Sequence, residues 1–363
     1  MIEQPAARRR HGRAWQVARV VVSLALAVAM FWYLLGSAAD FSEVRAAIGS
    51  MTSLELATLA LVAAWNLATY WAVMVSATPG LTYPQAMVLT ESTTAVANTV
   101  PGGSAIAVGL TYAMLGSWGF SRSRSTLSVI VSGLWNSFAK LAMPVLALAL
   151  LAMQGNANAG RVTAGLFGIV ALVGSVAVFA LVLRTEAFAR RVGDTAARWF
   201  SSVRRLFGKG PVEGWGVATA KFRNRTIGLV RHTWGRLTVA TLVSHLSLYV
   251  VLLVALRHIG VSNGEVSWAE ALAVFAFVRL LTAIPITPGG LGVVELGLIA
   301  GLATAGGDRD EVVAAVLIFR ALTYLLPVPF GLVTYLYWRR NSSWRGSAPP
   351  HSPSLAAAGS AGS

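Results

Sequence analysis

The chain has 363 residues, of which 56% are hydrophobic and only 12% are charged, against roughly 45–50% and about 25% in soluble domains. This balance excludes an ordinary soluble enzyme and predicts a membrane protein with roughly six to ten passes, since about 20 apolar residues cross the hydrocarbon core. The chain contains no cysteine, which excludes disulfides, thiolate catalysis and thiolate metal sites.

The first expected membrane segment covers residues 14–36 and follows a basic tail, residues 1–14, that is rich in arginine. A secretory signal peptide is the alternative, because the letters GSAA could form a cleavage site. The apolar region is longer than a typical signal core of roughly 7–15 residues. We therefore favour an uncleaved membrane anchor with a cytoplasmic basic tail.

Further apolar segments follow along the chain, and most are long enough to form membrane helices. We expect them at residues 54–77, 84–98, 104–115, 125–153, 162–183, 237–259, 268–285, 291–305 and 312–338. The segment at 84–98 would form only about 22 Å of helix, and its neighbour at 104–115 is shorter still. These two are expected to form a hairpin that enters the membrane and returns, as are 268–285 and 291–305.

Both expected hairpins break at the letters PGG, at residues 101–103 and 288–290. A long apolar helix follows each break and carries one cation and then a proline, which are Lys140 with Pro144 and Arg320 with Pro327. Two similar units of opposite orientation are the sequence signature of an inverted-repeat transporter with its site near the midplane. The sequence therefore predicts an all-α polytopic membrane protein with about six full spans plus two broken re-entrant helical hairpins.

Lysine and arginine are concentrated in segments that this arrangement places in the cytoplasm: the basic tail, the loop with Arg122 and Arg124 before the segment at 125–153, a basic loop at 184–236, and the chain after the last span. The outer loops hold only Arg45, Arg161 and Arg309. This asymmetry follows the positive-inside rule and accounts for the net charge of +15 without a nucleic-acid partner. It places both termini in the cytoplasm, with the first hairpin open to the cytoplasm and the second to the outside.

Two polar regions complete the chain. Within the basic loop, residues 187–209 combine arginines with aromatic residues and are suited to an interfacial helix on anionic lipid, although a solvated loop is the alternative. Residues 341–363 are rich in Ser, Pro, Ala and Gly and are expected to form a disordered tail. The membrane domain is therefore expected to cover residues 15–340.

The residues at the two breaks are the first candidates for a binding site. Non-helical backbone at membrane depth must be buried in protein or line a wet cavity. The free N–H groups at the start of the half-helix that follows would attract an anion such as a phosphate. The alternative is that the glycines only allow close helix packing. The candidates are Pro101, Gly102, Gly103, Pro288, Gly289, Gly290 and Gly292.

Ionisable residues inside the expected spans form a second group of candidates: Glu91, Lys140, Arg279, Glu295 and Arg320. Each costs about 2.5–3.5 kcal/mol in the bilayer on insertion scales, so each should face protein or water and have a partner. We expect Glu295 to pair with Arg320 or Arg279, and Glu91 to pair with Lys140. These residues contact the substrate in one interpretation and only fix helix packing in the other.

Two long motifs carry a resemblance to a known family. The stretches AIPITPGGLGVVELGL (283–298) and FRALTYLLPVPFGLVTYLYWRR (319–340) resemble the lysylphosphatidylglycerol synthase transmembrane region family, also called UPF0104. The stretch ANTVPGGSAIAVGLTYAMLGSWG (97–119) resembles the first-hairpin region of actinobacterial members. The likeness extends over about residues 15–340.

This resemblance implies a multi-pass protein of the bacterial inner membrane that handles lipids, with lipid translocation as the suggested role. The family includes the flippase half of multiple peptide resistance factors and the membrane part of some archaeal glycosyltransferases. Aminoacylating members carry a large cytoplasmic transferase domain after the membrane region. The residues after Trp338 do not provide one, so we do not expect this chain to aminoacylate lipids.

The leading expectation is therefore a flippase for an anionic phospholipid or a polyprenyl-linked lipid, with the glycine breaks holding the headgroup. An ion-coupled small-solute transporter, in which Glu295 or Glu91 carries protons, is the second. A non-catalytic membrane partner of a lipid-modifying or glycosyl transferase is a further alternative. A membrane enzyme is disfavoured because the sequence offers no nucleophile–base pair. It also offers no metal-ligand cluster or nucleotide-binding loop, so we expect no metal or other cofactor.

Overall fold

A computed structural model of the protein describes residues 51–100, 102–155, 159–205, 214–282 and 287–346, together with residues 49 and 210. Within these ranges the chain consists of α-helices, one 3-10 turn and one π-helical turn, with no β-strand. The basic tail, the first expected membrane segment at 14–36, Pro101 and the chain from residue 347 onward lie outside the described residues.

Five of the described helical stretches are long and apolar enough to cross a membrane. They correspond to five of the full spans expected from the sequence, and the remaining expected span is the segment at 14–36. The five are α3 (Ser53–Ala77), α6 (Arg122–Met153), α7 (Ala159–Arg184), α9 (Trp215–Ile259), and the stretch formed by α12 (Arg309–Arg320), the π-helical turn η2 (Ala321–Leu325) and α13 (Pro327–Arg340). The protein is therefore an all-α polytopic membrane protein, as predicted.

Pairs of shorter helices occupy the positions of the two expected hairpins. The first pair is α4 (Tyr83–Thr99) and α5 (Gly103–Ser117). The second pair is α10 (Trp268–Leu281) and α11 (Val293–Thr304), with the 3-10 turn η1 (Pro288–Gly290) between them. Each of these helices is shorter than the roughly 20 residues that a full crossing requires.

The first helix of each hairpin begins with the same local device, a capping box. Before α4, the Thr82 hydroxyl accepts a hydrogen bond from the Gln85 N–H, and the Gln85 side chain accepts one from the Thr82 N–H. Before α10, Ser267 and Glu270 make the same reciprocal pair of bonds. A capping box satisfies two backbone donors and fixes where a helix starts, so the entry point of each hairpin is set locally.

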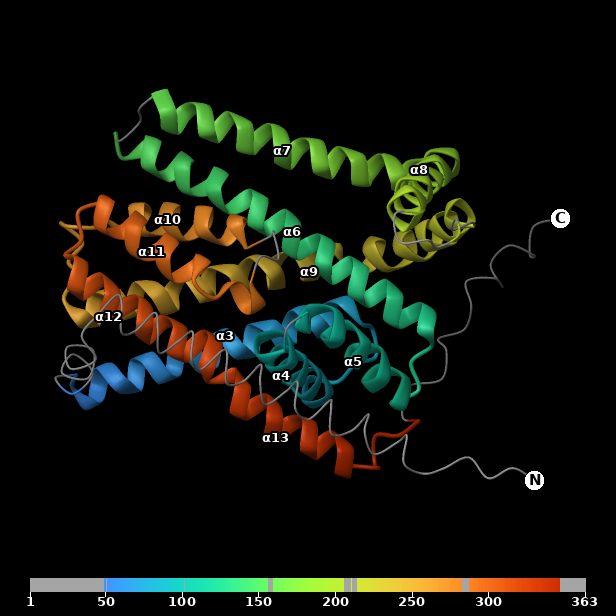
Figure 1. Cartoon of the computed structure of the whole chain (residues 1–363), viewed down its shortest axis with the longest axis horizontal. Helices are drawn as coiled ribbons and strands as arrows, with labels where there is room; N and C mark the ends of the chain where they lie inside the picture. The colour runs from blue at the N-terminus through green and yellow to red at the C-terminus, as the bar shows by residue number, and fades with distance from the viewer. Residues whose placement is uncertain are drawn as a thin grey trace.

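The helices pack in a way that relates one half of the chain to the other. Each half contains a helix, a hairpin and a following span: α3, α4–α5 and α6 form the first unit, and α9, α10–α11 and α12–α13 form the second. The first helices of the two units, α3 and α9, pack against each other. The first helix of each hairpin packs against the last span of the other unit, α4 against α13 and α10 against α6. In Figure 1 the α10–α11 hairpin opens toward the end that carries the link between α6 and α7, whereas the α4–α5 hairpin opens toward the opposite end, near α8. This arrangement is that of an inverted repeat.

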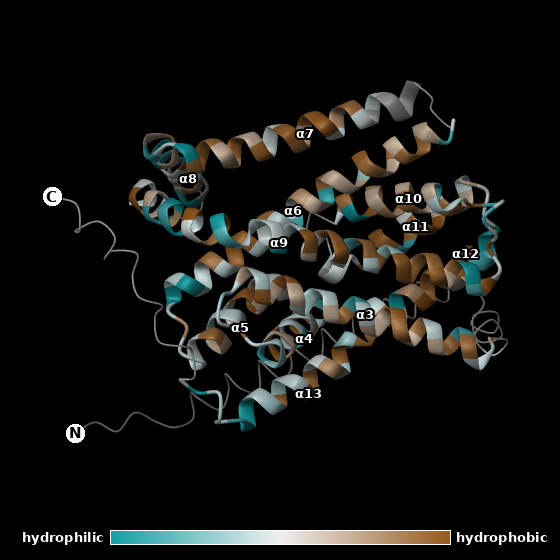
Figure 2. Cartoon of the chain, turned by 180° about the vertical axis from the view of Figure 1, so that it is seen from behind, coloured by the Kyte–Doolittle hydropathy of each residue, from teal (hydrophilic) through white to brown (hydrophobic). Residues whose placement is uncertain are grey.

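Most of the basic segment at 184–236 is helical. Its first part is a helix, which was one of the two alternatives for residues 187–209, and its second part belongs to α9 rather than to a loop. Helix α8 (Glu186–Arg205) runs across the end of α7 (Figures 1 and 2), and α9 already begins at Trp215 rather than near residue 237. The Asp194 carboxylate on α8 accepts a hydrogen bond of 3.1 Å from the Gly216 N–H at the start of α9. This cap comes from another helix, so the local sequence around Trp215 does not reveal it.

Helix α7 lies at the periphery and is predominantly hydrophobic (Figure 2). Many of its large apolar side chains are exposed. Phe167 is 72% exposed and Val170 is 69% exposed. An outward apolar face of this length suits contact with lipid tails.

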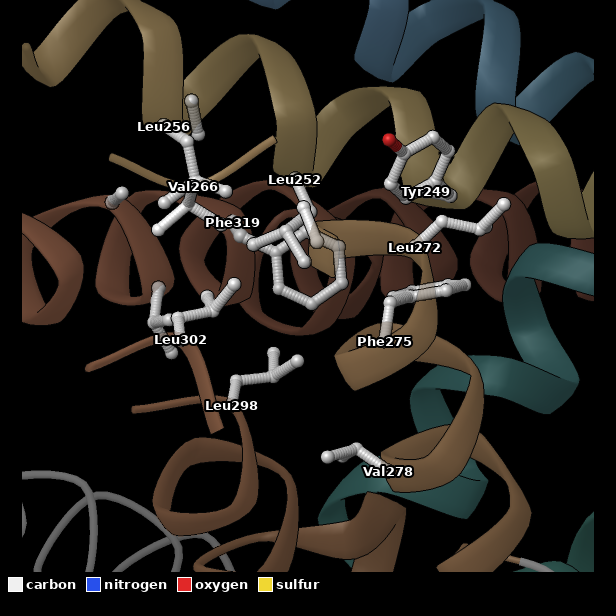
Figure 3. Close-up of a cluster of buried hydrophobic side chains, with 14 of the residues drawn as sticks. Tyr249, Leu252, Leu256, Val266, Leu272, Phe275, Val278, Leu298, Leu302 and Phe319 are labelled. Carbon is white, nitrogen blue, oxygen red and sulfur yellow. The ribbon is translucent and has the colours of Figure 1, made fainter. Parts of the chain in front are cut away.

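A cluster of buried apolar side chains holds the second hairpin in place (Figure 3). Leu252 and Leu256 of α9 meet Phe275 of α10 together with Leu298 and Leu302 of α11, and all five are almost fully buried. Lipid tails are as apolar as leucine, so dispersion contacts and shape complementarity, rather than exclusion of water, stabilise this packing.

Candidate functional site

The chain can break at the two hairpin tips only because glycine stands there. Gly102 has a φ of +68°, and Gly289, Gly290 and Gly292 have φ values of +58°, +73° and +81°. L-amino acids rarely adopt this left-handed region because their Cβ atom clashes with the backbone, whereas glycine has no Cβ atom. The structure thus places both predicted breaks where the sequence placed them.

Glu295 and Arg320 form the buried ion pair that the sequence offered as one of two alternatives. The Arg320 Nε–H donates to Glu295 Oε1 at 2.6 Å. The other carboxylate oxygen accepts a hydrogen bond of 2.8 Å from the Gly292 N–H, and Arg320 Nη2 donates to the Gly289 carbonyl at 3.3 Å. The pair therefore ties α12 to the break of the second hairpin.

Tyr324, a residue that the sequence analysis did not single out, joins the tips of the two hairpins. Its hydroxyl donates to the Asn98 carbonyl at 2.6 Å, and the Asn98 amide donates to the Tyr324 carbonyl at 3.3 Å. The Arg320 guanidinium lies 4.5 Å from the centre of the tyrosine ring. Tyr324 lies in the π-helical turn η2, and such turns are frequent at functional sites because they change which side chains face a neighbour.

A cavity of about 310 Å³ lies between the two hairpins. Asn98 and Ser104, on either side of the first break, contribute to its wall, as do Thr287, Gly289 and Gly290 of the second break. This volume is at the lower end of the roughly 300–1,000 Å³ typical of small-molecule sites. The neighbours of the first break and residues of the second break thus line one cavity, whereas Gly102, Gly103 and Gly292 are not among its lining residues. A cavity of this kind is where irregular backbone is tolerated at membrane depth.

The remaining ionisable candidates, Glu91, Lys140 and Arg279, also line this cavity. Lys140 Nζ donates to the Thr282 hydroxyl at 3.3 Å. The Nε atom of Arg279 is buried and has no hydrogen-bond partner among the described residues. Neither cation forms an ion pair with a carboxylate in the part of the chain that the structure describes.

Of the two alternatives for Glu295, Arg320 is the partner and Arg279 is not. The other expected pairing is wrong. Glu91 does not pair with Lys140 but accepts a hydrogen bond of 2.7 Å from the indole N–H of Trp71 on α3. Position along a helix indicates which face a residue shares with its neighbours, but it does not identify the side chain opposite on another helix.

The backbone amides at the breaks are less available than the sequence analysis expected. The Gly103 N–H donates to the Val100 carbonyl at 2.7 Å, and the Gly290 N–H donates to the Thr287 carbonyl at 3.1 Å. The Gly292 N–H is taken by Glu295. The strongest anion-attracting groups in the cavity are consequently the side chains of Lys140 and Arg279.

The described residues contain no group of three or more metal-ligating side chains. The cavity wall instead combines hydroxyl, amide and charged side chains with apolar ones such as Leu248, Phe275 and Leu298. The polar groups among them can bind and orient a polar ligand by hydrogen bonds and charge, and they need no bound metal to do so.

The sequence is similar to known membrane proteins. A family model described as the lysylphosphatidylglycerol synthase transmembrane region matches residues 20–331. A UPF0104 membrane protein of Methanocaldococcus jannaschii is 42% identical over 62 residues, which covers 17% of this chain and 26% of that protein. The aligned part is thus about a quarter of the length of that relative. Because the family model covers most of the chain, this protein belongs to the lysylphosphatidylglycerol synthase transmembrane region family.

Proposed function

We propose that this protein translocates an anionic phospholipid or polyprenyl-linked lipid, and that Lys140 and Arg279 hold the anionic headgroup in the cavity between the two hairpins. The observation that carries the proposal is the presence of these two cations in one polar cavity without a carboxylate partner among the described ion pairs. A cation inside the membrane domain is costly unless it is paired or hydrated. A phosphate group would supply the missing negative charge and strong hydrogen-bond acceptors.

The size and position of the cavity also suit this substrate. A space of about 310 Å³ accepts a compact headgroup, while the acyl or polyprenyl chains remain in the lipid. The inverted arrangement of the two hairpins supports alternating access, in which one half of the molecule moves relative to the other around a site near the midplane.

The orientation of the protein follows from charge. Helix α8, the N-terminal part of α9 and the C-terminal end of α13 carry many arginines, and such segments face the cytoplasm by the positive-inside rule. We propose a bacterial plasma-membrane protein with both termini in the cytoplasm. In this orientation the first hairpin opens to the cytoplasm and the second to the outside.

A reconstitution experiment tests the proposed function. Purified protein is inserted into vesicles that contain phosphatidylglycerol labelled with a fluorophore on one acyl chain, and a membrane-impermeant quencher reports movement between leaflets. The wild-type protein is expected to accelerate this movement relative to protein-free vesicles. The variants Lys140→Gln and Arg279→Gln should be slower by roughly 10–100-fold, because a hydrogen bond to a charged group contributes about 1.5–3 kcal/mol.

The control variant is Lys221→Gln, which neutralises an exposed cation of α9 far along the sequence from the cavity residues. It should move the lipid at the wild-type rate. Equal rates for wild type, Lys140→Gln and Arg279→Gln would contradict the proposal. The alternative function, small-solute transport, is tested in parallel with radiolabelled glycerol phosphate trapped in the vesicles. A small-solute transporter would release the glycerol phosphate and would not move the lipid between leaflets.

A further inference from the structure

Glu91 lies in the middle of α4, roughly 12 Å along the helix from Tyr83 at 1.5 Å per residue. Its side chain lines the cavity but is only 1% exposed. One carboxylate oxygen accepts the hydrogen bond from Trp71, and the other has no hydrogen-bond partner among the described residues. Glu91 is therefore a buried carboxylate whose charge is only partly satisfied.

The charged and titratable groups around the cavity come from several helices. Helix α6 contributes Lys140, α10 contributes Arg279, and α3 contributes Tyr70. Arg320 of α12 also lines the cavity but is neutralised by Glu295, and the Tyr324 hydroxyl of η2 donates a hydrogen bond to the Asn98 carbonyl.

The other helices near the cavity add no charge at Glu91. Helix α13 packs against α4 at Gly331 and through the Ser92–Thr334 hydrogen bond, and α5 contributes the Ser104 hydroxyl. On α9, His245 is buried and its Nδ1 faces the Thr241 carbonyl. Glu91 is thus the carboxylate of the described cavity wall that has no ion-pair partner.

The charges of Lys140, Arg279 and Glu91 are linked through the space they share. Glu91 lines the same cavity as the two cations, without an ion pair to either of them. When an anion engages the cations, it places a second negative charge in the space that the Glu91 carboxylate also lines. Two like charges in one site disfavour each other's ionised form, so the carboxylate gains affinity for a proton.

We propose that Glu91 is a proton-binding site coupled to occupancy of the cavity, so that it binds one proton when an anion engages Lys140 and Arg279 and releases it when the anion leaves. The proton comes from water on the side to which the cavity is open, and an O–H bond forms at the carboxylate oxygen that Trp71 does not bind. The inference rests on the proposed function and deepens it. Anion and proton then cross the membrane together, so a proton gradient can drive the transport.

Coupling between two ligands is reciprocal, which fixes the sign of the pH effect. If anion binding promotes proton binding at Glu91, lower pH promotes anion binding. If no proton is taken up, the dissociation constant of the anion should not depend on pH. If one proton is taken up, the dissociation constant should rise by about tenfold per pH unit between the pH at which Glu91 loses its proton in the empty protein and the higher pH at which it does so in the anion-bound protein.

Binding of dioctanoyl phosphatidylglycerol to the purified protein tests this relation, because its phosphodiester keeps the same charge between about pH 5 and 9. The wild-type protein should show the tenfold weakening per pH unit over part of this range, and addition of the lipid in weak buffer should remove protons from solution. Glu91→Gln keeps the acceptor for Trp71 but cannot ionise. It should bind the lipid as tightly as the wild-type protein at low pH and without the pH-dependent weakening.

Two further variants separate Glu91 from its neighbours. Lys140→Arg replaces a cation that can lose its proton by one that cannot. If Glu91 causes the loss of lipid affinity at rising pH, this variant should still show that loss. Trp71→Phe removes the hydrogen bond that favours the ionised carboxylate, and it should shift the weakening to higher pH. This variant also tests the inference if Glu91→Gln fails to fold.

The outcomes distinguish this inference from the proposed function. Two results would contradict the role of Glu91 and leave the anion site intact. One is lipid binding with the same pH dependence in the wild-type protein and Glu91→Gln. The other is lipid binding by the wild-type protein without proton uptake. Failure of the wild-type protein to bind the lipid at any pH contradicts the anion site, and with it the coupling.

Discussion

Both carboxylate oxygens of Glu295 are bound by protein groups, one by Arg320 and the other by the Gly292 N–H. Arg320 in turn binds the Gly289 carbonyl and lies over the Tyr324 ring. Groups that are already satisfied by the protein gain little from a ligand, whereas the Nε atom of Arg279 lacks a partner among the described residues. At the residue scale, the geometry distinguishes a brace, made by Glu295 and Arg320, from Lys140 and Arg279, which we propose to be the binding pair.

This separation predicts the behaviour of neutral variants of the brace. Glu295→Gln and Arg320→Gln each leave one buried charge unpaired, and each should lower stability by about 3–5 kcal/mol. The double variant leaves no unpaired charge and should recover most of the stability and the lipid transport. Thermal unfolding and vesicle transport of all four proteins measure both quantities. A stable double variant that transports no lipid would instead make the pair part of the binding site.

At the element scale, the limits of the hairpin helices were predicted closely. The first helix was expected at 84–98 and is found at Tyr83–Thr99, and the last was expected at 291–305 and is found at Val293–Thr304. These helices start and stop at capping residues, prolines and glycines, which act locally and are visible in the sequence.

The elements that the sequence missed depend on contacts between distant segments. The span expected at 312–338 is interrupted by the π-helical turn η2, whose Tyr324 bonds to Asn98 in the first hairpin. Helix α9 begins early because Asp194 of another helix caps it. The charged residues of the cavity could be predicted from the sequence because they stand out within apolar segments. Their hydrogen-bond partners, Trp71 for Glu91 and Thr282 for Lys140, could not, because they lie on distant segments of the chain.

The opposite orientation of the two hairpins is a prediction at this same scale. Because the chain has no cysteine, one can be introduced at each hairpin mouth, at Arg122 after α5 or at Asp310 after α11, where both side chains are exposed. In intact cells a membrane-impermeant maleimide should label Asp310→Cys, while Arg122→Cys should react only after the membrane is permeabilised. Labelling of both positions from outside would contradict the proposed topology.

At the scale of the whole molecule, the two halves of the chain meet at one polar cavity. Each half places a hairpin tip at its wall, and the spans α6 and α12 that follow the hairpins place Lys140 and Arg320 there. With Glu295 and Arg320 neutralising each other, Lys140 and Arg279 outweigh Glu91 by one positive charge among the ionisable side chains described above. This positive excess favours an anion as the ligand of the cavity.

Native mass spectrometry of the protein purified from its membrane in mild detergent tests this assignment most directly, because it weighs the lipid that remains bound. The wild-type protein should retain an anionic lipid, and the double variant Lys140→Gln/Arg279→Gln should lose it while Lys221→Gln keeps it. Retention of the same anionic lipid by wild type and the double variant, or retention of only zwitterionic lipids by the wild-type protein, would contradict the account.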